Sequence, residues 1–322
     1  MSTATRVAAF VVAIAAVFAL AFGVGRVFGP SNEPAAVAHD AHAVADEPEA
    51  PQGVSAETEA LPGGLMISQS GYTLTLDKSP VTPGRAVAVA FMITGPDGRP
   101  VTTYETEHEK QLHLIAVRRD FTGFQHVHPE LSGAGVWSTE LDLTAGQWRL
   151  FADFKATGAE ALTLGADLAV AGDYQPSTRQ GLSRTAEIDG YTVTLDGDLE
   201  AGSDAMLTLS VRRHGEPVTD LQPYLGAYGH LVALRAGDLA FLHVHPDGTP
   251  DDAATKPGPE VVFHAAVPSP STYHLYLDFK HNGVVRTASF AVDAGGAASS
   301  AAAPPRDQNP GETPAHGGHR GH

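Results

Sequence analysis

The sequence predicts an all-β protein made of two tandem immunoglobulin-like antiparallel β-sandwiches, preceded by one N-terminal transmembrane helix. Short segments such as GYTLTLD (71–77) and AVAVAFMIT (86–94) alternate between polar and apolar residues, which is typical of strands with one buried face. Turn sequences separate these segments and no helical period appears, so an antiparallel sandwich is favoured. The same strand pattern then recurs in the second half of the chain.

This recurrence is an internal duplication. GYTLTLD (71–77) returns as GYTVTLD (190–196), and RLFADFK (149–155) returns as HLYLDFK (274–280). Because strands and turns recur in one order, both halves should share a fold. The expected segments are an N-terminal membrane anchor or signal segment at 1–28, a disordered Pro/Ala/acidic linker at 29–64, β-sandwich repeat 1 at 65–172, a linker at 173–185, β-sandwich repeat 2 at 186–293, and a disordered His-containing tail at 294–322.

The apolar run near the N-terminus predicts where the protein resides. Residues 7–25 carry no charge, and at 1.5 Å per helical residue they span about 28 Å, close to the thickness of a bilayer core. A cleaved signal peptide would have a shorter apolar region and a closer small-residue site, whereas Ala-Val-Ala at 36–38 lies far downstream. The sequence favours an uncleaved signal-anchor, which places the main domains outside the cytoplasm on a single-pass membrane protein. If the segment is cleaved, the protein is secreted.

Composition excludes several classes of function. The chain has 37 acidic and 20 basic side chains, a formal net charge of −17, which opposes binding to nucleic acid. It has no cysteine, so disulfides, zinc–thiolate sites, thiol catalysis and blue-copper centres are all excluded. Because no set of nucleophile, base and acid stands out, we expect a protein that is not an enzyme.

Two copies of a histidine motif carry the functional prediction. FQHVHPE (124–130) recurs as FLHVHPD (241–247), and on a strand both histidines of each copy point to one face. Another histidine lies thirteen residues upstream of each copy, and a hairpin with a tight turn would pair His113 with His126 and His230 with His243. Three imidazoles in each repeat would then share one sheet face. The predicted metal ligands are His113, His126, His128, His230, His243 and His245.

Neighbouring residues add detail to the predicted sites. The hairpins would place Phe124 opposite Ile115 and Phe241 opposite Val232, as an apolar floor beneath the imidazoles. Asp153 and Asp278 occupy matching places and either orient an imidazole or face solvent. His264 and His274 are candidates for a fourth ligand in the second repeat, or surface residues. A charged strand edge is expected at Glu105, Glu107, His108 and Glu109.

Metal ligation competes with two other interpretations, structural histidines and a pH-responsive cluster. Both halves keep the full trio at one relative spacing although they differ at most other positions, which favours a metal. An all-nitrogen site suits Cu(II) or Zn(II), whereas Cu(I) carriers tend to use Met or Cys. Methionine occurs only at positions 1, 66, 92 and 206, and the residues themselves do not choose between copper and zinc.

The stretch HEKQLHLIAVRRDFTGFQHVHPE (108–130) resembles the YtkA-like and FixH-like extracytoplasmic β-sandwich proteins of bacteria, in the duplicated form of the actinobacterial type. The resemblance covers residues 65–293, and HLIAVRRDFTGFQHVHP is its most specific part. It implies copper more than zinc, and a role in binding, buffering or delivering the ion. A copper-receiving or copper-exporting membrane protein would then be a partner. The alternative is a non-metal interaction module of the cell envelope with structural histidines.

Overall fold

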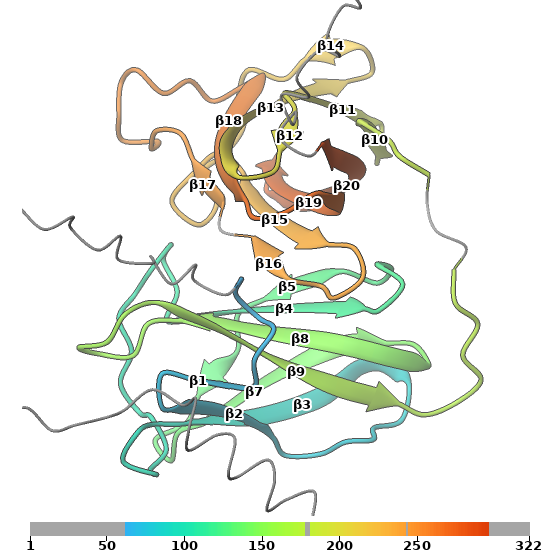
Figure 1. Ribbon diagram of the computed structural model, residues 1–322. Helices are drawn as coiled ribbons and strands as arrows, with labels where there is room; N and C mark the ends of the chain where they lie inside the picture. Colours follow the sequence, from blue (N-terminus) through green and yellow to red (C-terminus); the bar gives the residue numbers. More distant parts are fainter. Residues whose placement is uncertain (1–61, 178–180, 243, 296–322) are drawn as a thin grey trace, which may run out of the picture. The chain divides into compact units, whose positions relative to one another are not determined.

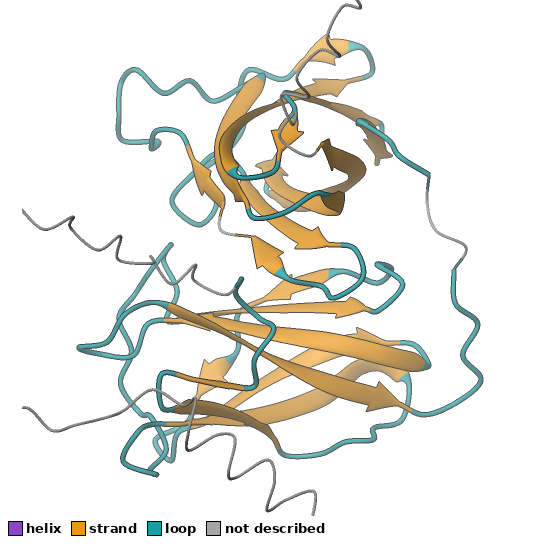
Figure 2. Cartoon of the chain, viewed as in Figure 1, coloured by secondary structure: helices purple, strands orange, loops and turns teal. Residues whose placement is uncertain are grey.

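The computed structural model describes residues 62–177, 181–242 and 244–295, and every regular element in this part of the chain is a β-strand (Figure 2). The prediction of an all-β fold with two repeats is confirmed. The predicted membrane segment, nearly all of the linker that follows it and most of the tail lie outside the described residues. In the described part, no helix is long and apolar enough to cross a membrane.

The first repeat consists of two sheets that enclose an apolar core (Figure 1). One sheet has the order β1 (Ser68–Gln69), β2 (Tyr72–Leu76), β3 (Gly84–Thr94), β7 (Val136–Leu143) and β6 (Glu130–Leu131). The other has the order β5 (Gln125–Val127), β4 (Leu112–Arg118), β8 (Gly146–Phe154) and β9 (Leu162–Val170). Phe91 and Trp137 from the first sheet pack in the same core as Trp148 from the second.

The second repeat is built in the same way. One sheet has the order β10 (Thr185–Ile188), β11 (Tyr191–Asp196), β13 (Ser203–Arg213), β18 (Glu260–Val267) and β17 (Val244–Pro246), with β14 (Glu216–Pro217) also pairing with β13. The other has the order β12 (Leu199–Glu200), β20 (Val284–Gly295), β19 (Ser271–His281), β15 (His230–Arg235) and β16 (Phe241–Leu242). Several edge strands are only two residues long.

Burial along the strands explains how the sequence specifies two layers. In β3 the residues Val89, Phe91 and Ile93 are buried and alternate with more exposed residues, as the pattern predicts. In β4, by contrast, six successive residues from Leu112 to Val117 are buried. Such a run requires side chains packed against both faces of the strand. One face packs in the core of its own repeat, and the other repeat packs against the second face.

A third apolar cluster draws on both repeats. Leu114 and Ala116 of β4 face the core of their own repeat, while Ile115 and Val117 belong to this shared cluster. Its other buried members are Phe151, Val232, Leu234, Leu239 and Tyr276, with Phe121, Phe124 and Phe241 packed against them. The expected apolar floor therefore exists, but it lies between the repeats.

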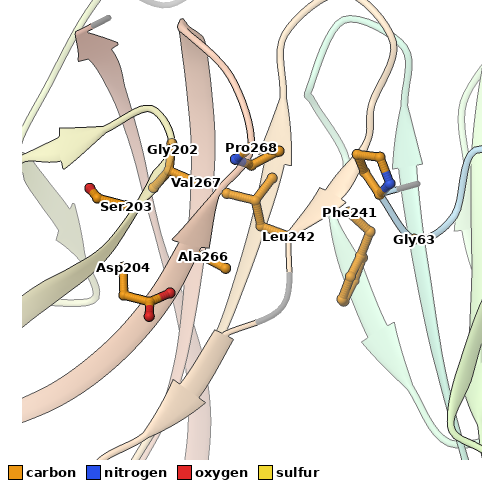
Figure 3. Close-up of a pocket in the computed structure, with 10 residues that line it drawn as sticks. Gly63, Gly202, Ser203, Asp204, Phe241, Leu242, Ala266, Val267 and Pro268 are labelled. Atoms are coloured by element: carbon orange, nitrogen blue, oxygen red, sulfur yellow. The ribbon is translucent and has the colours of Figure 1, made fainter. Parts of the chain in front are cut away.

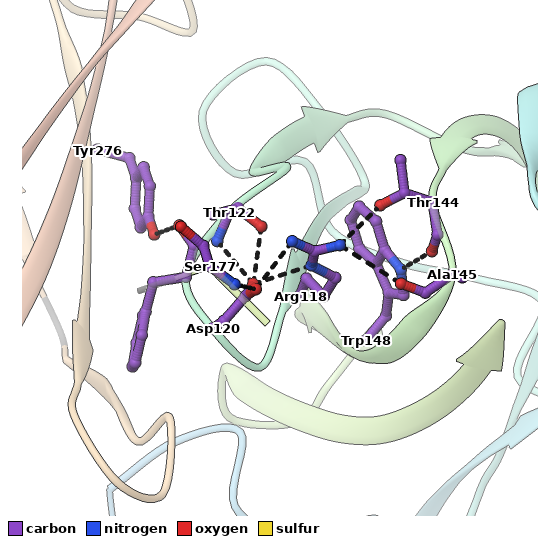
Figure 4. Close-up of polar contacts among 9 residues, drawn as sticks. Arg118, Asp120, Thr122, Thr144, Ala145, Trp148, Ser177 and Tyr276 are labelled. Atoms are coloured by element: carbon purple, nitrogen blue, oxygen red, sulfur yellow. Dashed lines mark hydrogen bonds and ion pairs between the residues drawn. The ribbon is translucent and has the colours of Figure 1, made fainter. Parts of the chain in front are cut away.

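Two contacts illustrate how this shared cluster is held. The Phe124 ring stacks on Tyr276 with ring centres 4.0 Å apart. The Tyr276 hydroxyl donates a hydrogen bond of 2.8 Å to the carbonyl of Phe121, at the tip of the hairpin between β4 and β5 (Figure 4). Apolar packing and a directional bond thus hold the same surface.

The predicted hairpin register is wrong by two residues in both repeats. His126 pairs with Ile115 rather than His113, and Phe241 pairs with Leu234 rather than Val232. The turns are longer than the two residues expected, since the Arg118 amide donates to the Thr122 carbonyl and the Arg235 amide to the Ala240 carbonyl. A shift of two keeps every side chain on its original face, because side chains alternate with a period of two. In the first repeat the predicted face therefore holds although the predicted partners do not.

Candidate metal centre

The three predicted ligands of the first repeat come together. His113 lies on β4, His126 on β5, and His128 directly after β5, and one ring nitrogen of each lies within 4.8 Å of the others. His113 is only 3% exposed, and the side chain of His126 is only 2% exposed. The even hairpin register produces this grouping, because residues 126 and 128 share a strand face with residue 113 across the sheet.

Hydrogen bonds on the outer side of two rings define their tautomers. His113 Nε2 lies 3.1 Å from the Glu107 carbonyl oxygen, so this nitrogen carries the hydrogen and donates it. His126 Nδ1 lies 2.9 Å from a carboxylate oxygen of Asp278, so this nitrogen is also the donor. Asp278 is held in turn by the Thr287 hydroxyl. A ligand histidine characteristically donates its second N–H in this manner to a carbonyl or carboxylate.

The inner nitrogens of the same two rings then face each other. His113 Nδ1 and His126 Nε2 are 3.1 Å apart, and the bond to Glu107 leaves His113 Nδ1 as an acceptor in the neutral ring. Either a shared hydrogen or a metal ion between these nitrogens accounts for so short a distance. Nitrogens bound to one tetrahedral ion are about 3.3 Å apart, because each metal–nitrogen bond is ~2.0 Å long. The spacing therefore suits two ligands of a single metal ion.

A proton is a poor substitute for the metal at neutral pH. Burial lowers the pKa of His113 to about 4, an effect that the charge of His126 reinforces and the Glu107 carbonyl opposes. Burial likewise lowers the pKa of His128 to about 3, with His126 and His113 acting in the same direction. Both imidazoles are therefore in the neutral form that binds metals. In the described part of the chain, His128 Nε2 is buried and has no hydrogen-bond partner.

One cavity connects this cluster with solvent. It has a volume of about 470 Å³, and its lining includes His128 together with Glu109, Lys110 and Glu130. A metal site needs such an entry path, and two carboxylates at the entrance favour cations. Among the described residues, none that lines a second cavity of about 440 Å³ beside Phe241, Leu242 and Val267 is a histidine (Figure 3).

The second predicted trio does not form on one sheet face. His230 lies on β15, and its ring is next to those of His113 and His126 of the first repeat. His245 lies on β17, which belongs to the opposite sheet, and its Cα partner is His264 on β18. The segment changes sheets after Leu242, earlier than its counterpart in the first repeat. His243 lies outside the described residues.

The remaining candidates have mixed outcomes. Asp278 orients an imidazole as anticipated, although that imidazole belongs to the other repeat. Asp153 accepts a hydrogen bond from the Thr163 hydroxyl. His274 stacks on Phe121 with ring centres 3.8 Å apart, and His264 is exposed near Asp247, so neither joins the cluster.

Sequence reasoning missed two contributors from the segment before β4. The Glu107 carbonyl fixes the tautomer of His113, and a backbone acceptor leaves no trace in a residue pattern. The His108 ring centre lies 6.1 Å from that of His113 and 5.8 Å from that of His230. The sequence contains one signal that His108 lies near the cluster, because it is a histidine five residues before His113. The expected charged strand edge is instead a turn in which His108 and Glu109 have positive φ angles.

Comparison with known families identifies the two repeats. The sequence matches the family described as Domain of unknown function (DUF8832) over residues 67–171 and again over 186–296, and the chain belongs to this family. A search of the curated proteins found no match.

Three solved structures show limited similarity to the chain. A DUF4426 family protein from Pseudomonas aeruginosa is 8% identical with a TM-score of 0.25, covering 34% of this chain and 96% of that protein. The Escherichia coli adhesin FdeC is 17% identical with a TM-score of 0.23, covering 71% and 65%. The Yersinia pseudotuberculosis adhesin InvE is 11% identical with a TM-score of 0.20, covering 70% and 59%. All three TM-scores are well below 0.5, so these likenesses define no function.

Proposed function

We propose that this protein binds one transition-metal ion through His113, His126 and His128. The observation that carries the proposal is the grouping of three imidazoles with one ring nitrogen of each within 4.8 Å of the others, while two outer nitrogens donate to Glu107 and Asp278. A third, unpartnered imidazole nitrogen on His128 lies within reach of the same point. A structural role alone does not explain why the buried His128 Nε2 has no hydrogen-bond partner among the described residues.

Copper is the proposed ion, with zinc as the competitor. Nitrogen ligands suit Cu(II) and Zn(II) alike. The resemblance of residues 108–130 to the YtkA-like and FixH-like proteins supports copper. It also supports an extracytoplasmic location, as does the apolar run at 7–25, from which we propose attachment to the cell membrane. The proposed role is to bind, buffer or deliver copper, in exchange with a copper-receiving or copper-exporting membrane protein. We propose binding rather than catalysis.

The test is a metal titration of the full chain in detergent. The five histidines of the linker and the tail (His39, His42, His316, His319 and His322) are first replaced by alanine, because they would scavenge the same ions. Calorimetry with Cu(II) and with Zn(II) should then show one ion per chain at neutral pH. His126→Ala combined with His128→Ala should remove that ion while the fold persists. His264→Ala, at an exposed histidine outside the cluster, is the matched control.

Each outcome separates the competing interpretations. If neither ion binds at neutral pH, the histidines are structural and the cell-envelope interaction module becomes the better function. If two ions bind with similar affinity, the second repeat has a site of its own. A double variant that unfolds would show that His126 and His128 act as core residues.

A further inference from the structure

The His230 ring of the second repeat lies at coordination spacing from the first-repeat cluster. Two imidazoles on one tetrahedral ion have ring centres about 5 Å apart, because the bonds are ~2 Å long and each ring centre lies about 1 Å beyond its nitrogen. Within the trio the ring centres are 5.3, 5.0 and 5.0 Å apart. The His230 ring centre lies 4.8 Å from that of His126 and 5.6 Å from that of His113.

His230 also has a nitrogen that needs a partner. Its Nδ1 atom is buried and makes no hydrogen bond to any described residue, the same condition as His128 Nε2. A buried polar atom without a partner destabilises the folded state, so such atoms in a native structure require an explanation. Here two unpartnered imidazole nitrogens, one from each repeat, occur in a single histidine cluster. A shared ligand would satisfy both.

The second repeat already supplies part of the surroundings of the first-repeat ligands. Asp278 lies on β19 directly across from His230, and its carboxylate accepts the Nδ1 hydrogen of His126. Both side chains in this contact are almost fully buried, at 3% and 2% exposed. The Tyr224 ring, from the same repeat, has its centre 6.4 Å from that of His128. The cluster is therefore incomplete without the second repeat.

We propose that His230 is the fourth ligand of the ion held by His113, His126 and His128. This inference rests on the proposed function and adds to it that a single ion is bound by both repeats at once. His230 is outside the group of nitrogens that lie within 4.8 Å of one another, so the proposal requires its ring to turn toward the ion. The ion then stabilises the contact between the repeats in addition to the apolar cluster they share. Four imidazole ligands fill a tetrahedral site and leave no position for a substrate, which fits storage or transfer.

The ligand count tests the inference. Cu(II) is added to the full chain carrying the five tail and linker substitutions, and pulsed electron paramagnetic resonance reports the coordinated imidazoles. The expected number is four in the parent and three in both His230→Ala and His230→Phe, with affinity at least tenfold weaker in each. His230→Phe keeps the ring volume, so that a packing defect cannot produce the loss. His264→Ala should retain the parent affinity and the parent count.

A second measurement follows the coupling between repeats. Hydrogen exchange with and without Cu(II) should show metal-dependent protection in β4 of the first repeat and in β15 and β19 of the second. In His230→Phe, metal-dependent protection should be confined to the first repeat. This readout requires that the variant still bind the ion through the remaining trio.

The outcomes distinguish the two levels of the proposal. If the parent binds no ion, the proposed function fails and this inference fails with it. If the parent binds one ion but both His230 variants keep its affinity and imidazole count, the three-histidine site stands and His230 is not a ligand. Protection in β15 and β19 that is unchanged by His230→Phe would likewise overturn the bridging role.

Discussion

Acidification should destabilise the metal-free protein between about pH 6.5 and pH 4, because its central histidines are buried in the neutral form. His113 is the best-defined case, since burial lowers its pKa to about 4 and the residue is 3% exposed. In the unfolded chain the same imidazole has a pKa near 6.5. Between these values the unfolded state binds a proton that the folded state does not. Stability from this group is therefore present above about pH 6.5 and is lost as the pH falls toward 4.

The size of this loss of stability follows from the shift in the pKa of His113. Each pKa unit corresponds to about 1.4 kcal/mol, so the displacement of His113 contributes up to roughly 3 kcal/mol to the free energy of unfolding at neutral pH. Burial also lowers the pKa values of His128 and His230, which act in the same direction. Below about pH 4 the folded form takes up the proton at His113 as well, and that contribution no longer changes with pH.

Urea unfolding between pH 7 and pH 4.5, in the presence of a chelator, measures this dependence. The free energy of unfolding should fall steadily across the range, and His113→Phe should flatten the fall by up to about 1.4 kcal/mol per pH unit. The slope is the readout, because the variant also loses the bond to the Glu107 carbonyl and so has a lower overall stability. An exposed histidine provides the control, since His264→Ala should leave the slope unchanged. Identical slopes in the parent and His113→Phe would refute the reasoning.

Three further predictions concern individual contacts. Asp278→Asn should weaken metal affinity about 10- to 100-fold in a competition titration, because it removes the charged acceptor that orients His126. The control, Asp247→Asn beside the exposed His264, should leave the metal affinity unchanged. His230→Phe should raise the metal-free free energy of unfolding by about 1–3 kcal/mol in chelator, since it removes a buried nitrogen without a partner; a loss of stability would contradict this. Phe151→Ala should cost about 3–5 kcal/mol in urea unfolding because it empties part of the cluster shared by the repeats, while Val285→Ala, at 39% exposure, should change little.

Alternation and repetition in the sequence were sufficient to predict the two all-β repeats. The strand face containing Val89, Phe91 and Ile93 could be read directly, because a period of two is a local property of the chain. The hairpin register could not be predicted in this way, since it depends on the geometry of the turn. Phe121 and Leu239 adopt positive φ angles that are rare for such residues, and the turns they belong to shift each register by two. Because the shift is even, the histidine trio of the first repeat was still found.

The two described histidines of the predicted second trio lie on different sheets for a reason that local pattern does not contain. FLHVHPD and FQHVHPE are nearly the same sequence, yet the chain leaves β16 at Leu242 and joins the opposite sheet, whereas β5 continues to Val127. Which sheet a short edge strand joins depends on tertiary packing. The near-identity of two motifs predicted the same arrangement in both repeats, whereas the described histidines 230 and 245 lie on different sheets.

The duplication itself explains why a site should lie between the repeats. The shared apolar cluster contains equivalent positions from both copies, with Ile115 matching Val232 and Val117 matching Leu234. The motifs align at the same offset, so Phe124 matches Phe241 and His113 matches His230. When two copies of one surface pack against each other, residues near the axis relating them meet their own counterparts. The His113 and His230 rings stack within 10° of parallel, which is the contact this geometry predicts. A histidine needed once per repeat for packing thereby becomes, after duplication, a pair capable of sharing one ion.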